Sequence, residues 1–274
     1  MIKDKKGIEI KELIEESELE ISRIYNKKYT ANRILEAGAQ KPGLSLSGYS
    51  KYLNKNQVQI FGKTEIGYLM GLSASEREKC LKTFLSLKIP GIIISENQQI
   101  DDSIVTTAQR YRTPILISAL RSSLLNSRII SFLYRDFSKK IKINGVLMDI
   151  MGLGILITGE SGIGKSETAL ELINKGHQLI SDDLVEFYLN SNDEPVGRSL
   201  DRIKQWLEVR GLGIINIVDL FGVGAILEEK KLDLVINLES WNPKKKYERL
   251  GEGKLYFSIL GKDIPMFKLP VALG

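Results

Sequence analysis

The sequence is poor in the residues that build disulfide frameworks and histidine-rich metal sites. It has one cysteine, Cys80, and one histidine, His177, among 274 residues. These counts exclude an internal disulfide, a metal site made of several cysteines, and a zinc site that needs several imidazoles. We interpret Cys80 as a small buried hydrophobe on the helix that carries Phe84 and Leu87, and His177 as a local capping or packing residue after Gly176.

Long apolar runs are also missing. No stretch approaches the ~18 apolar residues that a membrane-spanning helix needs. The charged start MIKDKKGIEIKEL lacks the apolar core of a signal peptide. Hydrophobic residues make up 43% and charged residues 27% of the chain, which is typical of a soluble globular protein. We therefore expect a cytoplasmic protein with no membrane partner.

The excess of positive charge is small, with 39 Lys and Arg against 34 Asp and Glu and a formal net charge of +5. Residues 21–63 are the most basic stretch, because they hold eight Lys or Arg and one acid, Glu36, among several tyrosines. No DNA-binding helix pair or RNA-binding signature accompanies them. We interpret this stretch as a solvated surface and expect no nucleic-acid partner. A nucleic-acid-binding ATPase is an alternative that rests on this stretch alone.

The hydrophobic pattern predicts the α/β class, with two domains. Residues 1–137 read as an N-terminal mixed α/β domain and residues 138–274 as a P-loop catalytic domain with a mainly β core, joined at the basic link 138–142. In the first domain we expect helices at 8–20, 73–87 (with Ser73 and Glu76 at capping-box spacing), 102–112 and after 118, and strands at 92–95 and 115–118. In the second we expect strands at 143–150, 152–159, 177–181, 184–189, 214–218, 232–238, 254–260 and 264–269, and a helix at 165–175.

The strongest functional signal is a phosphate-binding loop that follows an apolar strand and opens a helix. It matches the pattern G-x-x-x-x-G-K-[ST] and consists of Gly159, Glu160, Ser161, Gly162, Ile163, Gly164, Lys165 and Ser166. The glycines let backbone N–H groups turn toward phosphate oxygens, and the helix N-terminus adds a positive dipole. We expect Lys165 to reach the β- and γ-phosphates and Ser166 to reach a magnesium ion.

Two places offer the acid that such a loop needs on a neighbouring strand. Asp182 and Asp183 follow the strand ending at Ser181, whereas Glu239 ends another apolar strand. In a pair of adjacent carboxylates one can hold the metal while the other accepts a proton, and their mutual repulsion raises one pKa. We favour the aspartate pair, with a solvated turn as the alternative.

A second unusual segment runs from Leu207 to Asn216. Its glycines, beside Glu208 and Arg210, indicate backbone packed close to a ligand. On physical grounds alone the charged pair is equally consistent with a structural ion pair at a strand start. Taken by itself, Arg249, in YERLG, is interpreted as a charged residue on the surface.

Taken together, these segments resemble the bacterial HPr kinase/phosphorylase family. The resemblance rests on GESGIGKSETALELINKGHQLISDD, LEVRGLGIINIVDLFGVGA and LESWNPKKKYERLG, and extends to VQIFGKTEIGYL and KIPGIIIS. It implies a homohexameric, two-domain enzyme that uses Mg²⁺ and ATP or pyrophosphate. Such an enzyme phosphorylates a regulatory serine of the phosphocarrier HPr in carbon catabolite regulation, and removes the phosphoryl group by phosphorolysis.

The resemblance also implies roles for individual residues. The loop from Gly159 to Ser166 binds the nucleotide, and residues 207–216 serve both directions of the reaction. The single-residue roles are catalysis by Lys165 and Arg249, magnesium coordination by Ser166 and Glu208, and proton exchange with the substrate serine by Asp183.

Two departures from the family pattern stand out. Asn144, in INGVL, occupies the place of a catalytic histidine, 22 residues before the phosphate-loop serine. The sequence ends PVALG at Gly274, where the family continues into Pro-Gly-Arg and further helices. From these departures we expect a weakened hexamer and a bias toward kinase activity. A catalytically weakened, nucleotide-binding regulatory protein is the alternative.

Overall fold

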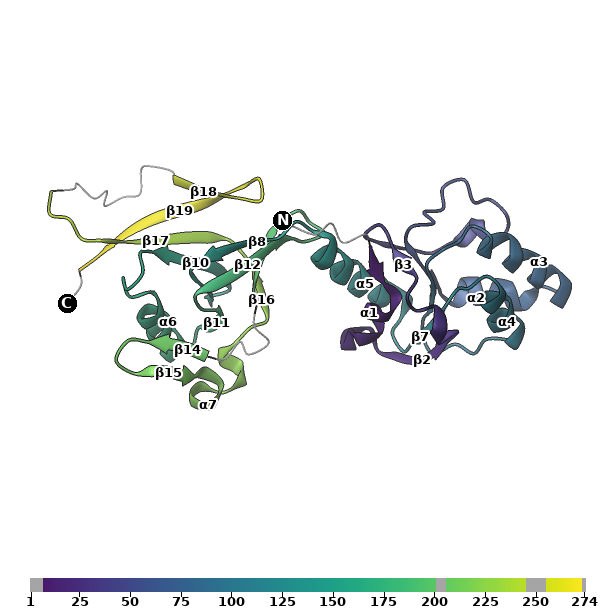
Figure 1. Cartoon of the computed structure of the whole chain (residues 1–274), viewed down its shortest axis with the longest axis horizontal. Helices are drawn as coiled ribbons and strands as arrows, with labels where there is room; N and C mark the ends of the chain where they lie inside the picture. Colours follow the sequence, from purple (N-terminus) through teal and green to yellow (C-terminus); the bar gives the residue numbers. More distant parts are fainter. Residues whose placement is uncertain (1–6, 201–205, 245–254, 273–274) are drawn as a thin grey trace. The chain divides into compact units, whose positions relative to one another are not determined.

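A computed structural model describes residues 7–200, 206–244 and 255–272 of the chain. The chain divides into two compact units, residues 1–137 and residues 138–274, both of mixed α and β structure (Figure 1). The predicted fold class is therefore confirmed. Over the described ranges, no helix combines the length and the apolar character needed to cross a membrane.

Unit 1 alternates short strands with helices. Its strands are β1 (Ile8–Glu9), β2 (Ile21–Tyr25), β3 (Arg33–Ile34), β4 (Ala39–Gln40), β5 (Val58–Phe61), β6 (Ile92–Ile94) and β7 (Ile115–Ser118). Its α-helices are α1 (Ile10–Glu15), α2 (Lys63–Gly71), α3 (Ala74–Leu85), α4 (Asp102–Arg110) and α5 (Ser122–Phe137), and its 3₁₀ turns are η1 (Ser17–Leu19), η2 (Lys27–Tyr29) and η3 (Gly43–Ser45).

The main sheet of unit 1 is buried on both faces. Its order is β2-β7-β6-β5-β4, with β4 to β7 parallel and β2 antiparallel to β7. Within β6, Ile92 and Ile94 pack with Phe84 of α3 on one face, whereas Ile93 packs with Ile129 of α5 on the other. Continuous apolar strands of this kind need cover on both sides, which produces a helix–sheet–helix sandwich.

The N-terminal region differs from the prediction of one helix over 8–20. Ile8 belongs to β1, α1 ends at Glu15, and Glu16 is extended with φ of −80° and ψ of 101°. Leu13 and Leu19 are both fully buried, and the break at Glu16 lets the chain turn so that both reach the core. The predicted capping box of α3 is confirmed, because the Ser73 and Glu76 N–H groups each donate to the other's side chain, at 3.0 and 3.3 Å.

The two scarce residues of the sequence have local roles. Cys80 packs against the core of unit 1 and donates from Sγ to the carbonyl of Leu46 at 2.8 Å, and burial raises the pKa of its thiol. The backbone N–H of His177 donates to the carbonyl of Leu172 at 3.1 Å, which caps the end of α6.

Unit 2 is dominated by strands. They are β8 (Ile141–Asn144), β9 (Val146–Ile150), β10 (Leu153–Gly159), β11 (Gln178–Ser181), β12 (Leu184–Leu189), β13 (Pro195–Ser199), β14 (Trp206–Val209), β15 (Gly213–Asn216), β16 (Glu229–Lys231), β17 (Leu234–Ser240), β18 (Leu255–Ile259) and β19 (Lys262–Val271). The helical elements are α6 (Lys165–Asn174), α7 (Ile217–Phe221) and the 3₁₀ turn η4 (Val223–Ala225).

The main sheet of unit 2 gathers several chain segments at one edge. Its order is β11-β9-β10-β17-β19-β18; β10 is parallel to β17, and β9 is antiparallel to both β10 and β11. The strands β10, β11 and β17 therefore run in one direction, and their carboxyl ends meet at the same edge. Helix α6 and the β14–β15 hairpin lie on one face of this sheet (Figure 1).

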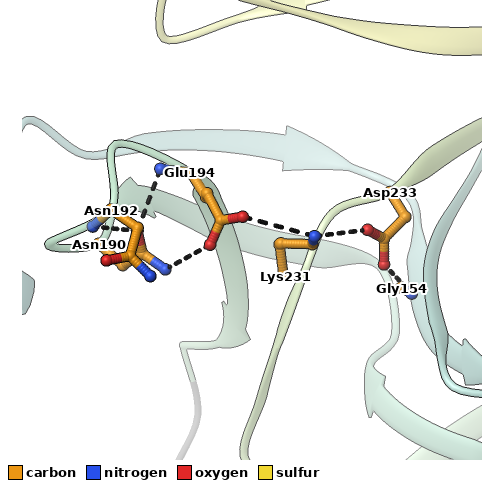
Figure 2. A network of polar contacts seen from close by, with 6 residues as sticks. All are labelled: Gly154, Asn190, Asn192, Glu194, Lys231 and Asp233. Carbon is orange, nitrogen blue, oxygen red and sulfur yellow. Dashed lines mark hydrogen bonds and ion pairs between the residues drawn. The ribbon is translucent and has the colours of Figure 1, made fainter.

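A polar network at the opposite end of β10 joins this sheet to the second sheet, β16-β13-β12-β8 (Figure 2). Lys231 forms ion pairs with Glu194 (3.5 Å) and Asp233 (3.1 Å), and Asp233 accepts the N–H of Gly154 at 2.9 Å. Asn190 connects the turn between β12 and β13 to Glu194. The start of β10 is thereby fixed to a hairpin that follows it by some forty residues.

Candidate active site

The candidate site is built at the edge where β10, β11 and β17 end. The phosphate loop follows β10, and Asp182 and Asp183 follow β11. Because β9 runs in the opposite direction, Asn144, which lies just before β9, reaches the same edge. Parallel strands commonly place ligand sites at their carboxyl ends, and here the topology alone brings the loop, the acids and the asparagine together.

The phosphate loop has the backbone needed to surround an anion. Gly162 and Gly164 have φ of 79° and 103°, a left-handed region that side chains rarely adopt. Ile163 is buried in the core and anchors the loop between them. Lys165 donates from Nζ to the carbonyls of Gly159 (3.1 Å) and Glu160 (2.9 Å), which holds its ammonium group over the loop. The side chains of Glu160 and Ser161 are exposed.

Asp182 faces the phosphate loop directly. Ser166 lies with Oγ 3.2 Å and 3.3 Å from the two carboxylate oxygens of Asp182. Burial raises the pKa of this carboxyl above 3.8, although hydrogen bonds from Ser166 and from the backbone N–H groups of Glu208 and Asp183 act in the opposite direction. The site therefore holds a partly desolvated carboxylate beside a hydroxyl in the first turn of α6.

Asp183 is placed differently from its neighbour. It is exposed, and its φ of 67° puts a non-glycine residue in the left-handed region, a strained conformation that is common at functional sites. Its carbonyl accepts the N–H of Gly145 at 2.9 Å, and Leu184 pairs with Asn144 across the β8–β12 ladder. Asn144 and Asp183 therefore lie next to one another across adjacent strands.

The β14–β15 hairpin brings the second unusual segment to the phosphate loop. Leu207 and Val209 are buried in the core beneath α6, whereas Glu208 and Arg210 alternate to the exposed side. A methyl group at Gly162 would come within 2.9 Å of Nη2 of Arg210, so this guanidinium lies against the loop. The hairpin therefore places a cation against the phosphate loop, and the proposed approach of its backbone to a ligand stays a prediction.

Metal ligands at this edge are few. Within the described ranges, no three carboxylate, imidazole or thiol side chains cluster as a metal cage would. Ser166 and Asp182 nevertheless offer one hydroxyl and one carboxylate, which suits magnesium, since it keeps several waters and takes further oxygens from phosphates. Glu239, the rival acid, follows Leu238, which pairs with Gly159 at the same edge. Arg249 lies outside the described residues.

Comparison with known proteins decides the family. The HPr serine kinase N terminus matches residues 8–133, and the HPr serine kinase C-terminal domain matches residues 135–274. The chain belongs to the HPr serine kinase family.

Relatives of this family are similar along almost the whole chain. The HPr kinase/phosphorylase of Listeria innocua serovar 6a is 39% identical over 269 residues, which are 98% of this chain and 86% of the relative. That of Bacillus mycoides is 38% identical over 267 residues, or 97% and 86% of the two chains. The solved Hpr(Ser) kinase/phosphatase from Coxiella burnetii has 32% identity and a TM-score of 0.43, covering 48% of this chain and 79% of that one.

Two residues at this edge could not be given an individual role from the sequence alone, Asp182 and Arg210. Asp182 received no specific role, because nothing in the sequence Asp-Asp says which carboxylate faces the loop. Arg210 belongs to the segment 207–216, but its sequence does not say whether it pairs with Glu208 or contacts the phosphate loop. The available signal was a basic residue in a glycine-rich turn, a combination that allows a guanidinium to approach another backbone closely.

Proposed function

We propose that this chain is a protein serine kinase that phosphorylates a regulatory serine of HPr and also catalyses the reverse phosphorolysis. Family membership along nearly the whole chain supports this proposal most directly. The observation on the molecule itself that supports it most is the Ser166–Asp182 contact beside a loop whose Gly162 and Gly164 have positive φ. Enzymes of this kind act in carbon catabolite regulation, and we propose the same role here, in the cytoplasm.

The phosphate loop would bind the phosphates of ATP, or pyrophosphate, through backbone N–H groups at the start of α6. Lys165, now bonded to two loop carbonyls, would exchange those bonds for phosphate oxygens. Arg210 adds a second positive charge against the loop at Gly162. Fixed positive groups of this kind stabilise the charge that spreads over a transferring phosphoryl group.

Ser166 and Asp182 are the residues that would hold magnesium, with Glu208 as the further ligand that the family resemblance implies. The donor set fits the ion, because the half-buried Asp182 carboxylate contacts the Ser166 hydroxyl and forms no ion pair with any described residue. A bound divalent ion would neutralise charge on the phosphate oxygens. The backbone of Glu208 lies close enough to Asp182 to lower the pKa of that carboxyl, so the two proposed metal ligands are neighbours.

Proton exchange with the substrate serine is the role we propose for Asp183. Its exposure leaves it accessible to a protein substrate, whereas Asp182 is occupied by Ser166. Asn144 lies beside it and can hydrogen-bond to a carboxylate or a phosphate, although an amide carries no proton near neutral pH. We propose that Asn144 positions these groups and that Arg249 supplies a further cation.

We also propose a homohexamer, as the resemblance implies. Apolar side chains on the β18–β19 hairpin support self-association, because Tyr256, Phe267 and Leu269 are each more than half exposed. Light scattering of the purified full chain tests the assembly. A monomer at micromolar concentration would contradict it.

The function is tested by incubating the purified chain and HPr with magnesium and ATP that carries a radiolabel in the γ-phosphate. We expect label on HPr, and none on an HPr variant whose regulatory serine is alanine. For the reverse reaction, phosphoserine-HPr and inorganic phosphate should yield pyrophosphate. ATP binding without any transfer would favour the regulatory alternative, and binding of neither ATP nor pyrophosphate would contradict both.

A further inference from the structure

Unit 1 contains a cavity of about 360 Å³ that lies between η3 and the first turns of α2. This volume falls within the range of small-molecule sites. The lining is apolar apart from a few polar atoms, and its main contributors are Leu44, Leu46, Ser47, Thr64, Glu65 and Tyr68. No role in phosphoryl transfer has been assigned to any of these residues.

The unusual member of this lining is Glu65. Only 5% of its surface is exposed, which is rare for a glutamate without a cationic partner. Oε2 accepts the N–H of Gly62 at 2.9 Å, so the residue closes the first turn of α2. Among the described residues, this carboxylate forms no second hydrogen bond and no ion pair, and its Oε1 is not fully sealed from solvent.

The cation closest to Glu65 in the sequence already has a carboxylate partner. Lys63, two residues before Glu65, pairs with Glu96 at 2.6 Å. The first turn of a helix stabilises one carboxylate charge, which accounts for a glutamate at this position. It does not account for burial of the carboxylate against an apolar cavity, because a buried charge gains most from a counter-charge that also hydrogen-bonds.

The corresponding glutamate of α3 shows what a capping role alone requires. Glu76 occupies the same position in its own helix and closes the same kind of turn. Its Oε2 accepts from both the N–H and the hydroxyl of Ser73, at 3.0 and 2.6 Å, and the side chain is exposed. A capping glutamate therefore needs neither burial nor a cavity.

We propose that this cavity binds a small organic monocation, an amine or amidine on an apolar body, whose charged nitrogen donates to Glu65 Oε1. The side chains of Leu44 and Leu46 would cover the apolar body. Tyr68, also in the lining, adds an aromatic side chain, a type of group that attracts cations.

The surroundings select against highly charged ligands. The segment that carries η3 includes Lys41, Lys51 and Lys55 and has no acid between residues 41 and 55. One of these cations, Lys51, lies 5.3 Å from the ring of Tyr52. A polycation approaching this face would meet repulsion, whereas a monocation with an apolar body loses little. This charge pattern favours a small molecule over a basic peptide.

The test uses the full chain and ligand-detected NMR titrations with 2-phenylethylamine, with its uncharged analogue 2-phenylethanol, and with a capped Leu-Arg-Leu peptide. Glu65→Gln keeps an acceptor for the Gly62 N–H but removes the charge. We expect it to weaken binding of the amine about tenfold to a hundredfold and to leave the alcohol unchanged. Glu76→Gln, the matched capping variant, should change neither.

A second variant, at another wall of the cavity, tests the proposal even if Glu65→Gln disturbs folding. Leu44 is 70% exposed, so Leu44→Ala removes a cavity wall without opening the core, and it should weaken both the amine and the alcohol. Absence of saturable amine binding, amine binding that Glu65→Gln leaves unchanged, or equal affinity for the alcohol would each overturn the proposal. Binding of the peptide without binding of the amine would overturn the proposal that the ligand is a small molecule.

Discussion

Ser166 Oγ lies 3.2 Å from Oδ1 and 3.3 Å from Oδ2 of Asp182, so the second residue of α6 faces the residue that follows β11. The contact joins the phosphate loop to one member of an adjacent acid pair and leaves the other, Asp183, exposed. Two carboxylates that are neighbours in the sequence therefore stand in different electrostatic surroundings, and the predictions below separate their roles.

Replacing Asp182 by asparagine should stabilise the fold at neutral pH. Because burial raises its pKa above 3.8, the folded chain holds this proton more tightly than the unfolded chain does. The free energy of unfolding therefore falls as pH rises from 3.8 through the folded-state pKa, and the deficit remains at pH 7. We expect Asp182→Asn to raise the denaturation midpoint at pH 7, with the difference narrowing as the pH falls toward 3.8. An equal gain in Asp183→Asn, the exposed neighbour, would contradict the role of burial.

In activity assays, we expect the Asp183 variant to lose rate and the Asp182 variant to need more magnesium. Asp183→Asn removes the proposed proton acceptor and should lower kcat for phosphorylation by about 10²–10⁴ without changing the magnesium requirement. Asp182→Asn should instead raise the magnesium concentration needed for half-maximal rate. Magnesium titrations of both variants check this, and a shifted requirement in Asp183→Asn alone would reverse the assignment.

Lys165→Ala should remove phosphoryl transfer in both directions while the fold persists. Lys165 Nζ bonds only to the carbonyls of Gly159 and Glu160 within the described structure, so its loss opens no core cavity. The expected result is an unchanged denaturation midpoint with no radiolabel on HPr. Substantial turnover in this folded variant would refute the role of the phosphate loop.

Asn144→His should raise both rates, and dephosphorylation more than phosphorylation. The position lies beside Asp183, and an imidazole can hold a proton near neutral pH where an amide cannot. Phosphorolysis requires Asp183 to return a proton to the leaving serine oxygen, so we expect a gain of at least about tenfold in that direction. Both rates are measured on the same HPr preparation. Asn144→Gln, which keeps the amide, is the control and should show no gain.

Gly154→Ala should unfold unit 2 or destabilise it by about 3 kcal/mol or more, because a methyl group would overlap the carbonyl oxygen of Lys231. It would also disturb the bond from Gly154 to Asp233 in the network of Figure 2. Gly224→Ala is the matched control, since a methyl group there meets nothing within 4 Å. Chemical denaturation measures both, and similar midpoints would refute the close approach.

The sequence by itself determined whatever depends on neighbouring residues. The phosphate loop is eight consecutive residues whose glycines permit the required backbone, so its place between β10 and α6 was predictable. The capping box of α3 is equally local. The edge strand β16, by contrast, was not predictable from the sequence. Its residues Glu229–Lys231 are all polar and show no apolar alternation, and they become extended by pairing with β13.

Tertiary structure alone decided which aspartate faces the phosphate loop and where Arg210 lies. The pairing of β11 with β9 is irregular between Leu179 and Ser181, immediately before the acid pair. An extra residue in one strand changes the direction in which the following side chains point, and Asp183 then enters the left-handed region while bonded to Gly145. Arg210 meets Gly162 because the β14–β15 hairpin packs on α6. The Asp183–Gly145 and Arg210–Gly162 contacts join residues more than thirty positions apart, and the register that creates them is settled only when the core packs.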